Sequence, residues 1–273
     1  MSSAPIGLFD SGVGGLSVLR SIRQQLPNEQ VLFIADQAHV PYGPRQLAEV
    51  RAFSKAITRY LLDRGAKLVV VACNTASAAA LYHLREAFPQ IPFVGMEPAV
   101  KPAAEQTISG VVGVLATPST FQGELYASVL ERFANGVTVL QDTCPGLVAQ
   151  IEKGRLDSPE TRTILEKALH PMLAKGVDRV VMGCTHYPFV IPMIREIVGS
   201  QVEVIDPAPA IARQTGRLLQ SLALNSPKAG PGAVHVLTTA DPHRLQALLP
   251  LLTGDSAQVQ PLGWDQGRLT QHI

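Results

Sequence analysis

The feature of this sequence that most constrains its fold is an internal duplication with a period of roughly one hundred residues. The stretch RGAKLVVVACNT at 64–75 resembles KGVDRVVMGCTH at 175–186, and in both a glycine lies eight residues before the cysteine. Glu-Pro-Ala at 97–99 then resembles Asp-Pro-Ala at 206–208, 24 and 22 residues after the respective cysteines. The shared order predicts two similar units.

An earlier pair of landmarks fits the same duplication. Gly7 in IGLFDS resembles Gly113 in VGVLAT. Asp36 follows the first glycine by 29 residues, and Asp142 follows the second by the same number. Both aspartates end an apolar run, so we expect them to be equivalent.

Short runs rich in Val, Ile and Leu alternate with segments of helical period. A helix is expected between the second and third runs, where apolar residues from Leu47 to Leu61 recur at spacings of three and four. This alternation predicts an α/β fold with mostly parallel sheets covered on both faces. The expected strands are 5–9, 30–35, 67–72, 91–95, 111–116, 136–140, 178–183, 202–205, 233–238 and 257–261.

Duplication and alternation together predict two pseudo-symmetric, doubly wound domains that face a shared cleft. We expect residues 1–97 plus 207–273 to form the first domain and 98–206 the second. Clefts between domains are common places for ligand sites.

Composition excludes several classes of function. Charged residues make up 16% of the chain, the net charge is +1, and no Lys/Arg cluster occurs, so nucleic-acid and membrane partners are not expected. The amino terminus has no secretory pattern, and apolar runs are too short to span a bilayer. Three dispersed cysteines suit free thiols in a reducing compartment, which indicates a cytoplasmic protein.

Cys73 is placed where catalytic groups often lie. It follows the apolar run LVVVA and precedes NTASAAALYHLREAF, which is expected to be a helix. The thiol therefore belongs at the carboxyl end of a strand and the amino end of a helix, where a thiolate is favoured. Cys184 holds the matching place between RVVMG and THYPFVIPMIREIV. One free cysteine alone is more often a small buried hydrophobe; two at equivalent points indicate a function.

Two thiols on opposite sides of a pocket suit a two-base reaction in which one removes a proton and the other delivers one. The resulting carbanion needs aimed N–H and hydroxyl donors. The candidate donors are Asn74, Thr75, Thr185, Thr117 and Thr120. Ordinary helix capping explains each of these side chains equally well when it is taken alone.

Other polar residues follow the same strands. Asp10 and Ser11 end the first strand, so Asp10 could assist proton transfer at Cys73 and Ser11 could hold a substrate group. His186 could assist Cys184 in the same way. The remaining histidines are interpreted as structural. Glu152 lies on an expected helix that could bring it to the cleft, and it is interpreted as a solvated charge.

The turn DSGVGGLS also resembles part of a dinucleotide fingerprint. Gly12 and Gly14 supply its first two glycines, but Ser17 stands at the third position. Asp36 ends the next strand as a ribose-binding acid would. A tight turn close to a small ligand explains the glycines equally well. Cys144 has no counterpart in the first half and is interpreted as structural.

As a set, these motifs resemble the glutamate racemases of the aspartate/glutamate racemase superfamily. The resemblance extends over most of the first 210 residues, and ATPST carries Ser119 where the family more often has glycine. An aspartate-specific relative would usually lack DSGVGG and carry an acid at His186. The matching stretches are IGLFDSGVGGLSVL (6–19), ADQAHVPYG (35–43), VVACNTASA (70–78), Thr117 with Thr120, MGCTHYPF (182–189) and IDPA (205–208).

The resemblance implies cofactor-independent racemisation of glutamate, with neither pyridoxal phosphate nor a metal. Cys73 and Cys184 would be the paired acid and base, supported by Asp10 and His186. The product would supply D-glutamate for peptidoglycan and so for cell shape, and a homodimer is the family expectation. The implied substrate contacts are Asp10, Ser11, Tyr42, Gly43, Asn74, Thr75, Thr185 and His186.

Two alternatives remain open from the sequence. The first is a related carbon-acid reaction on the same scaffold, such as racemisation of aspartate or a hydantoin. The second is a nucleotide-binding or two-lobed ligand-binding protein without turnover.

Overall fold

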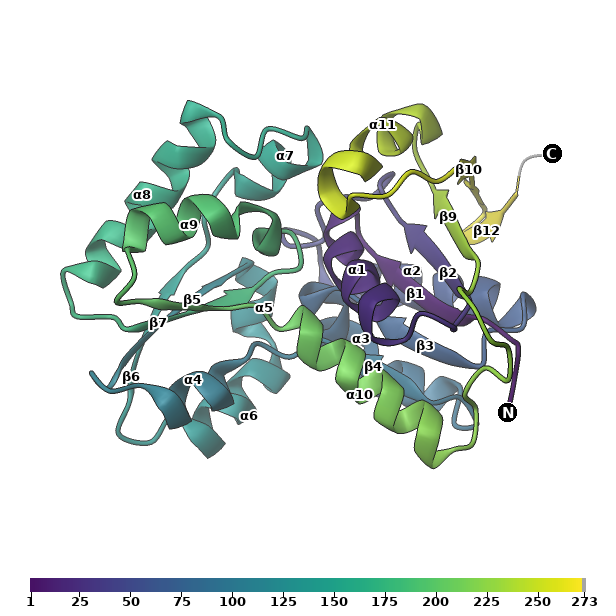
Figure 1. Cartoon of the computed structure of the whole chain (residues 1–273), viewed down its shortest axis with the longest axis horizontal. Helices are drawn as coiled ribbons and strands as arrows, with labels where there is room; N and C mark the ends of the chain where they lie inside the picture. The colour runs from purple at the N-terminus through teal and green to yellow at the C-terminus, as the bar shows by residue number, and fades with distance from the viewer. Residues whose placement is uncertain (272–273) are drawn as a thin grey trace. The chain divides into compact units, whose positions relative to one another are not determined.

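The computed structural model describes residues 1–271 and divides the chain into two compact units (Figure 1). The first consists of Met1–Met96 and the chain from Ala208 onward, and the second of Glu97–Pro207. Each is an α/β unit built on a parallel sheet, which confirms the expected fold class.

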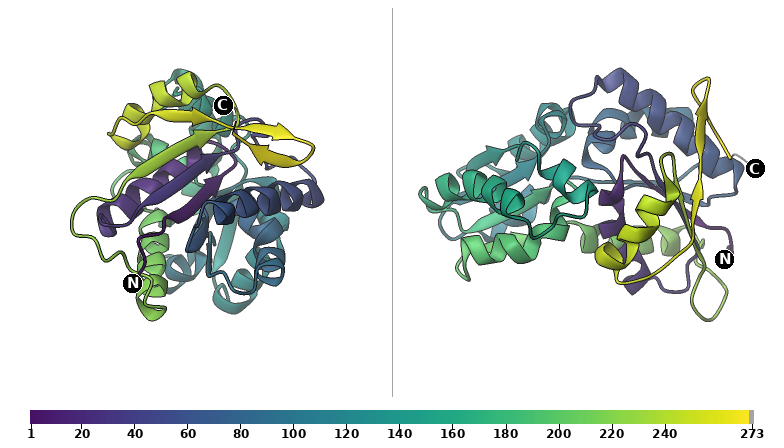
Figure 2. Two further views of the ribbon diagram at one scale, coloured as in Figure 1. Left: turned by 90° about the vertical axis from the view of Figure 1, so that its right-hand side faces the viewer. Right: turned by 90° about the horizontal axis from the view of Figure 1, so that it is seen from above.

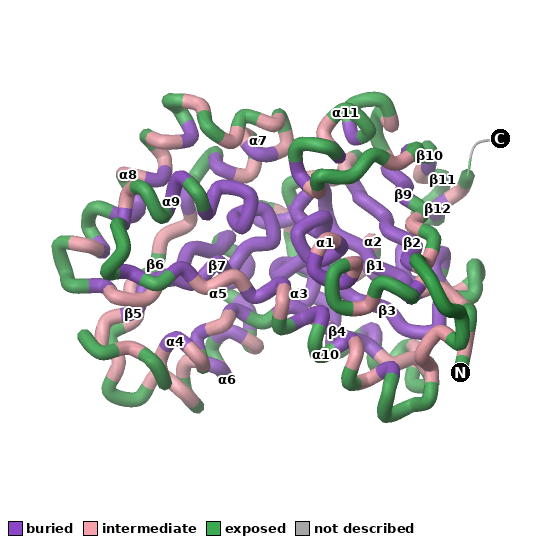
Figure 3. The backbone as a smooth tube through the Cα atoms, in the orientation of Figure 1, coloured by how far each residue is buried: buried purple, intermediate pink, exposed green. Residues whose placement is uncertain are grey.

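The sheet of the first unit has the strand order β10-β9-β2-β1-β3-β4, with every pair parallel. Its central strands are buried along their whole length, as parallel strands covered on both faces must be (Figure 3). The strands are β1 (Ile6–Asp10), β2 (Val31–Ala35), β3 (Leu68–Val71), β4 (Phe93–Gly95), β9 (Val234–Thr238) and β10 (Val259–Pro261).

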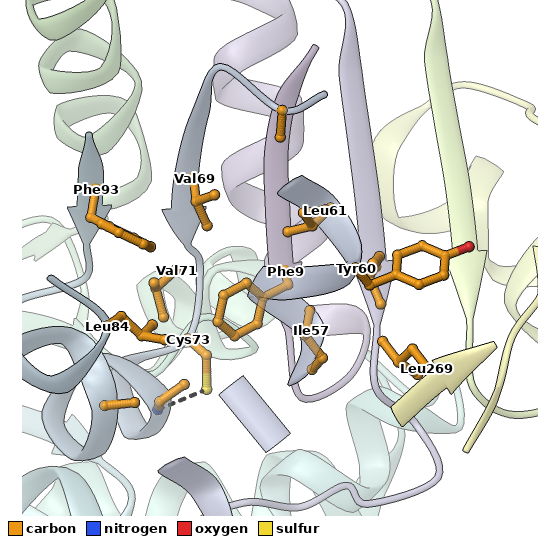
Figure 4. Close-up of a cluster of buried hydrophobic side chains, with 14 of the residues drawn as sticks. Phe9, Ile57, Tyr60, Leu61, Val69, Val71, Cys73, Leu84, Phe93 and Leu269 are labelled. Carbon is orange, nitrogen blue, oxygen red and sulfur yellow. Dashed lines mark hydrogen bonds between the residues drawn. The ribbon is translucent and has the colours of Figure 1, made fainter. Parts of the chain in front are cut away.

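Helices cover both faces of this sheet. α1 packs against α10 and α11, and α2 packs against α3 over a core that includes Phe9, Val71 and Leu84 (Figure 4). The helical elements are η1 (Val13–Gly15), α1 (Leu16–Gln25), α2 (Leu47–Asp63), α3 (Asn74–Ala87), α10 (Ala208–Ser221) and α11 (Pro242–Thr253).

The second unit repeats this topology with four parallel strands in the order β6-β5-β7-β8, which matches β2-β1-β3-β4. α4 packs against α6, and α8 packs against α7 and α9. The elements are α4 (Val100–Gln106), β5 (Val111–Ala116), α5 (Pro118–Gln122), α6 (Glu124–Phe133), β6 (Thr138–Asp142), α7 (Leu147–Glu152), α8 (Pro159–Leu173), β7 (Arg179–Gly183), η2 (Tyr187–Val190), α9 (Ile191–Val198) and β8 (Glu203–Ile205).

Strand register confirms the equivalence of the two cysteines. Gly7 pairs with Val69 in β3, four residues before Cys73. Gly113 pairs with Val180 in β7, four residues before Cys184. The two thiols therefore occupy the same point of the repeated topology.

The expected equivalence of Asp36 and Asp142 is wrong. Gly7 pairs with Leu32 and Gly113 with Leu140, so Asp36 lies four residues past its glycine's partner but Asp142 only two. Cys144 is the register equivalent of Asp36. The chain from Gly113 to its partner in β6 is two residues longer than the chain from Gly7 to its partner in β2. The equal spacing from each glycine to its aspartate is therefore a coincidence.

All ten expected strands are present, with ends shifted by at most two residues, but two elements differ from expectation. The segment after Cys184 is not one helix: η2 and α9 each begin with a proline in the first turn, Pro188 and Pro192. Proline is tolerated at a helix start and not inside, so each one begins a new short element. The chain also ends in an unexpected antiparallel hairpin, β11 (Gly263–Asp265) and β12 (Arg268–Thr270) (Figure 2).

Candidate active site

The candidate residues of the first unit gather at the carboxyl ends of three adjacent strands. Asp10 ends β1, Asp36 follows β2, and Cys73 follows β3. The hydrogen bonding between β1 and β2 continues beyond the end of β2, because the Asp36 N–H donates to the Asp10 carbonyl at 2.9 Å. This edge of a parallel sheet is where α/β proteins bind small ligands.

Cys73 is the N-cap of α3, and its thiol is buried, with 4% of the residue exposed. Its Sγ accepts a hydrogen bond from the Ala76 N–H at 3.4 Å (Figure 4). It also lies 3.8 Å from the Ser11 hydroxyl oxygen, to which the thiol donates. A backbone donor at a helix start stabilises the thiolate form, so the local structure suits an acid/base thiol.

Asp10 is fully buried and organises the glycine-rich turn that follows it. Its Oδ2 accepts from the backbone N–H groups of Gly12 at 3.1 Å and Gly15 at 3.0 Å. Gly15 approaches so closely that a Cβ there would lie 2.7 Å from the Asp10 Cβ. The glycines therefore serve a tight turn around a carboxylate, and two of its amides already have this acceptor in place of a phosphate.

Asn74 and Thr75, the first residues of α3, are both buried, with 3% exposed each. Within residues 1–271, neither polar atom of the Asn74 side-chain amide has a hydrogen-bond partner. A buried amide without partners costs free energy. By contrast, the Ser77 hydroxyl one turn later donates to the Val71 carbonyl at 3.1 Å and accepts from the Met96 N–H at 2.8 Å, which is a structural role.

Tyr42 and Gly43 lie in the segment between β2 and α2. The buried Tyr42 hydroxyl donates to Asp36 Oδ2 at 2.6 Å. Burial, followed by the charge of Asp36, raises the pKa of Tyr42 well above its ordinary value. Asp36 is thus enclosed by side chains of its own unit and does not act as a ribose-binding acid.

In the second unit Cys184 follows β7 and is buried, with 5% exposed. Its Sγ lies 3.8 Å from Nδ1 of His186. His186 is buried, with 2% of the residue exposed, and its Nε2 lies 2.6 Å from Oε1 of Glu152. The imidazole thus bridges a thiol and a carboxylate. Because no α-helix begins directly at Cys184, the helix-terminus argument applies only to Cys73.

The electrostatics of His186 follow from this bridge. Burial disfavours the charged imidazole and lowers its pKa, but the hydrogen bonds to Cys184 and Glu152 outweigh burial. The pKa of His186 is therefore raised well above its ordinary value. A protonated His186 beside Cys184 stabilises negative charge on the sulfur.

Three candidate hydroxyls share the sheet edge with Cys184. Thr185 is buried beside it, with 2% exposed. Thr117 and Thr120 follow the neighbouring strand β5, and their hydroxyl oxygens lie 2.9 Å apart. The Thr117 side chain makes no capping hydrogen bond to α5, so it is not an ordinary helix cap.

Sequence reasoning missed two neighbours of Cys184. Glu152, interpreted as a solvated charge, has a side chain only 12% exposed and is bound to His186, so that interpretation is wrong. Tyr187 is buried, donates to the Thr143 carbonyl at 3.1 Å, and has a pKa raised by burial and then by the charge of Cys184. The motif GCTHYP contains Tyr187, but Glu152 lies 34 residues away along the chain and gave no local signal.

Cys144 is buried and has a positive φ of 43°. Its N–H donates to Asp142 Oδ1 at 2.7 Å, and burial raises the pKa of its thiol. A thiol that favours its neutral form is unsuited to act as a base, in line with the structural interpretation.

Within residues 1–271, no three His, Cys, Asp or Glu side chains are grouped so that they could hold a metal ion. In the same range, no helix is long and apolar enough to cross a membrane.

Comparison with known proteins identifies the family. Residues 6–215 match the Asp/Glu/Hydantoin racemase family. A glutamate racemase from Roseiflexus sp. (strain RS-1) is 53% identical over 249 residues, covering 91% of this chain and 92% of the relative.

Solved structures agree with the sequence match. The crystal structure of a glutamate racemase from Bacillus anthracis has a TM-score of 0.87 at 31% identity, covering 98% of this chain and 100% of that one. A glutamate racemase from Francisella tularensis, solved in complex with D-glutamate, has a TM-score of 0.82 at 28% identity, with 95% and 97% covered.

The repeated α/β units, each with a thiol at the same strand end, and the family match together define an isomerase of the racemase class. The chain belongs to the glutamate racemases of the Asp/Glu/Hydantoin racemase family.

Proposed function

We propose that this chain interconverts L- and D-glutamate by two-base proton transfer between Cys73 and Cys184. In this scheme one thiol acts on each face of the substrate's Cα. The proposal needs only the acid and base groups of the chain itself.

In either direction one cysteine enters as the thiolate and the other as the thiol. The thiolate takes the proton from Cα, so an S–H bond forms, the C–H bond breaks, and its electron pair is delocalised into the carboxylate. The opposite thiol then gives its proton to the other face of Cα. Charge and protons balance, and the two sulfurs have exchanged protonation states.

The remaining candidate residues stabilise charge in this scheme. Asp10 and His186 assist the thiols, His186 by keeping positive charge beside Cys184. The substrate's charged groups would be bound by Ser11, Tyr42, Gly43, Asn74, Thr75, Thr117, Thr120, Thr185, Asp10 and His186. Donors in a dry site stabilise a carbanion far better than water does.

The observation that carries the proposal is the equivalence of the two cysteines. Each follows the third strand of the repeated topology, four residues past a matching register point. Each is buried beside its own polar partner, Ser11 for Cys73 and His186 for Cys184. The substrate is taken from the relatives, which are named glutamate racemases.

The decisive experiment is turnover of L-glutamate in D₂O. Two-base exchange places one deuterium at Cα of the D-glutamate formed, with no pyridoxal phosphate added and no loss of rate with a chelator. Product formed without deuterium at Cα would contradict the scheme. Parallel incubations with aspartate and a substituted hydantoin, followed by circular dichroism, distinguish glutamate from the other substrates of the family.

A binding module without turnover is the weaker reading. To bind a nucleotide, the chain would need amides in the glycine-rich turn that are open to a phosphate and an acid after β2 that is open to a ribose. Two amides of the turn bind Asp10, and Asp36 is bound by its own unit. Calorimetry with nucleotides and with both glutamate enantiomers tests this directly.

In the cell, we propose, the enzyme works in the cytoplasm as a homodimer and supplies D-glutamate for peptidoglycan. Expression in a bacterial strain that requires D-glutamate tests this role. Growth without added D-glutamate is expected from the native chain and not from Cys73→Ser. Sedimentation analysis of the purified protein tests the dimer.

A further inference from the structure

We propose that Trp264 in the carboxyl-terminal hairpin and Asp36 act as positioning residues for the segment 37–46, which carries Tyr42 and Gly43. This inference rests on the proposed function, because it assigns a purpose to residues around the same site. Neither residue is taken to touch the substrate.

The Asp36 carboxylate accepts hydrogen bonds from four side chains. Oδ1 accepts from the Thr239 hydroxyl at 2.8 Å and the Trp264 indole Nε1 at 2.8 Å. Oδ2 accepts from the Tyr42 hydroxyl at 2.6 Å and lies 2.9 Å from His39 Nδ1. Asp36 itself is fully buried. A buried carboxylate is costly unless its lone pairs are satisfied, so these donors fix its position.

The donors come from separate parts of the chain. His39 and Tyr42 belong to the segment 37–46, whereas Thr239 follows β9 and Trp264 lies in β11. The carboxylate therefore ties that segment to two elements more than 190 residues later, 203 for Thr239 and 228 for Trp264. Without such ties, a connection with little regular structure would be free to sample other conformations.

The hairpin is itself anchored in the core. Leu269 of β12 belongs to the same buried cluster as Tyr60 and Leu61 of α2 (Figure 4). The Trp264 ring lies 5.0 Å from the His39 ring and 5.6 Å from the Phe53 ring. His39 in turn stacks on Phe53 at 3.9 Å. These contacts hold the Trp264 ring in place, and its indole N–H in turn fixes the position of Asp36.

Asp36 is also connected to the proposed catalytic edge. Its N–H donates to the Asp10 carbonyl at 2.9 Å. The Tyr42 hydroxyl donates its proton to Asp36, so the substrate contact proposed for Tyr42 is one made by its backbone or as an acceptor. In this arrangement the tyrosine holds the turn at Gly43, and displacement of Asp36 would move that turn, while Asp10 stays fixed by the backbone N–H groups of Gly12 and Gly15.

The first test is Trp264→Phe, which removes the indole donor and keeps an aromatic ring. We expect KM for both glutamate enantiomers to rise about tenfold while kcat stays within about twofold, because binding geometry changes and the proton-transfer groups do not. Amide hydrogen exchange of residues 37–46 should quicken. The matched control is Glu29→Gln, which breaks the buried ion pair with Lys67 (2.6 Å). That pair precedes β2 and β3 at the opposite edge of the sheet, so it should lower stability without raising KM.

The second test is a mutant cycle with Asp36→Asn. If both residues act through one connection, Trp264→Phe with Asp36→Asn raises KM no more than Asp36→Asn alone. Trp264 is the single tryptophan of the chain, so Asp36→Asn should also shift the emission maximum of the protein. That shift reports the contact without any need for turnover.

Several results would overturn the inference. Unchanged KM and unchanged exchange at 37–46 in Trp264→Phe would do so, as would an equal rise of KM in Glu29→Gln or additive effects in the cycle. If the native chain does not racemise glutamate, the proposed function fails, and the exchange and emission measurements still decide the positioning role.

Discussion

Nε2 of His186 lies 2.6 Å from Oε1 of Glu152, while Nδ1 of the same ring faces the sulfur of Cys184 at 3.8 Å. This row of carboxylate, imidazole and thiol gives the second unit its own means of controlling charge at sulfur. The first unit has no histidine at the equivalent place; there a backbone N–H and the Ser11 hydroxyl contact the Cys73 thiol.

Glu152→Gln should lower the pKa of His186, because the carboxylate is one of the groups that raise it. We expect the imidazole to lose its proton at a lower pH than in the native chain, and the alkaline limb of kcat/KM to move the same way. The raised pKa stabilises the fold fully below the ordinary histidine pKa, and that contribution is lost as pH rises through the folded value. NMR titration of the histidine side chains measures the shift. Glu160→Gln, a change at a solvent-exposed acid of the same unit, should leave it in place.

Cys73→Ser and Cys184→Ser should each reduce racemisation at least about a hundredfold, because a hydroxyl cannot replace a thiol as base at neutral pH. Cys144→Ser is the matched control, since it makes the same atomic change at the third buried cysteine. Its activity should stay within about twofold of the native chain. Equal losses in all three variants would indicate general damage to the fold and contradict a specific pair.

Asn74→Ala should separate stability from binding. Its amide has no hydrogen-bond partner among the residues that the structure describes, so removing it should leave stability unchanged or add about 1 kcal/mol. That gain would raise Tm by about 2 to 4 °C. KM for glutamate should rise about tenfold if the amide binds the substrate. Ser77→Ala, on the same helix, removes a satisfied hydroxyl and should instead lower Tm.

Asp178 should contribute to acid stability far from the site. Burial opposes its charge, but hydrogen bonds from Thr107, Ser109 and Ile108 and the charge of Arg179 lower its pKa to about 2. A depressed pKa stabilises the fold above the unfolded value, near 4, and that stability is lost as pH falls toward 2. Asp178→Asn should therefore cost about 1 kcal/mol at pH 7 after allowance for solvent screening, and flatten the acid limb of stability. Denaturant unfolding between pH 2 and pH 7 measures both, while racemisation at pH 7 should be unchanged.

Much of the fold could be predicted from the sequence because parallel strands leave a strong local signal. Runs such as LVVVA are continuous and apolar since both faces of the sheet are covered. The hairpin at 263–270 left little signal. Its strands have three residues each, and its turn rests on positive φ at Gln266 and Gly267, of which only glycine is a usual marker.

Contacts between distant segments were harder to predict than strand positions. Cys73 and Cys184 could be matched because each directly follows an apolar strand. Glu152 could not be assigned, because only the packing of α7 near η2 brings it to His186. Counting along the chain even misled at Asp142, where a two-residue difference in the preceding segment shifted the register.

The division of the chain into units has a consequence for its synthesis. Strand β2 pairs with β9, which lies about two hundred residues later. Until the ribosome has delivered residues 234–238, the apolar strand VLFIA keeps one unpaired side, a form of exposed edge that promotes aggregation of nascent chains. The contiguous second unit, by contrast, has all its strands by residue 205. We therefore expect the second unit to fold first during synthesis, and the first unit, which is built from segments on both sides of it in the sequence, to fold last.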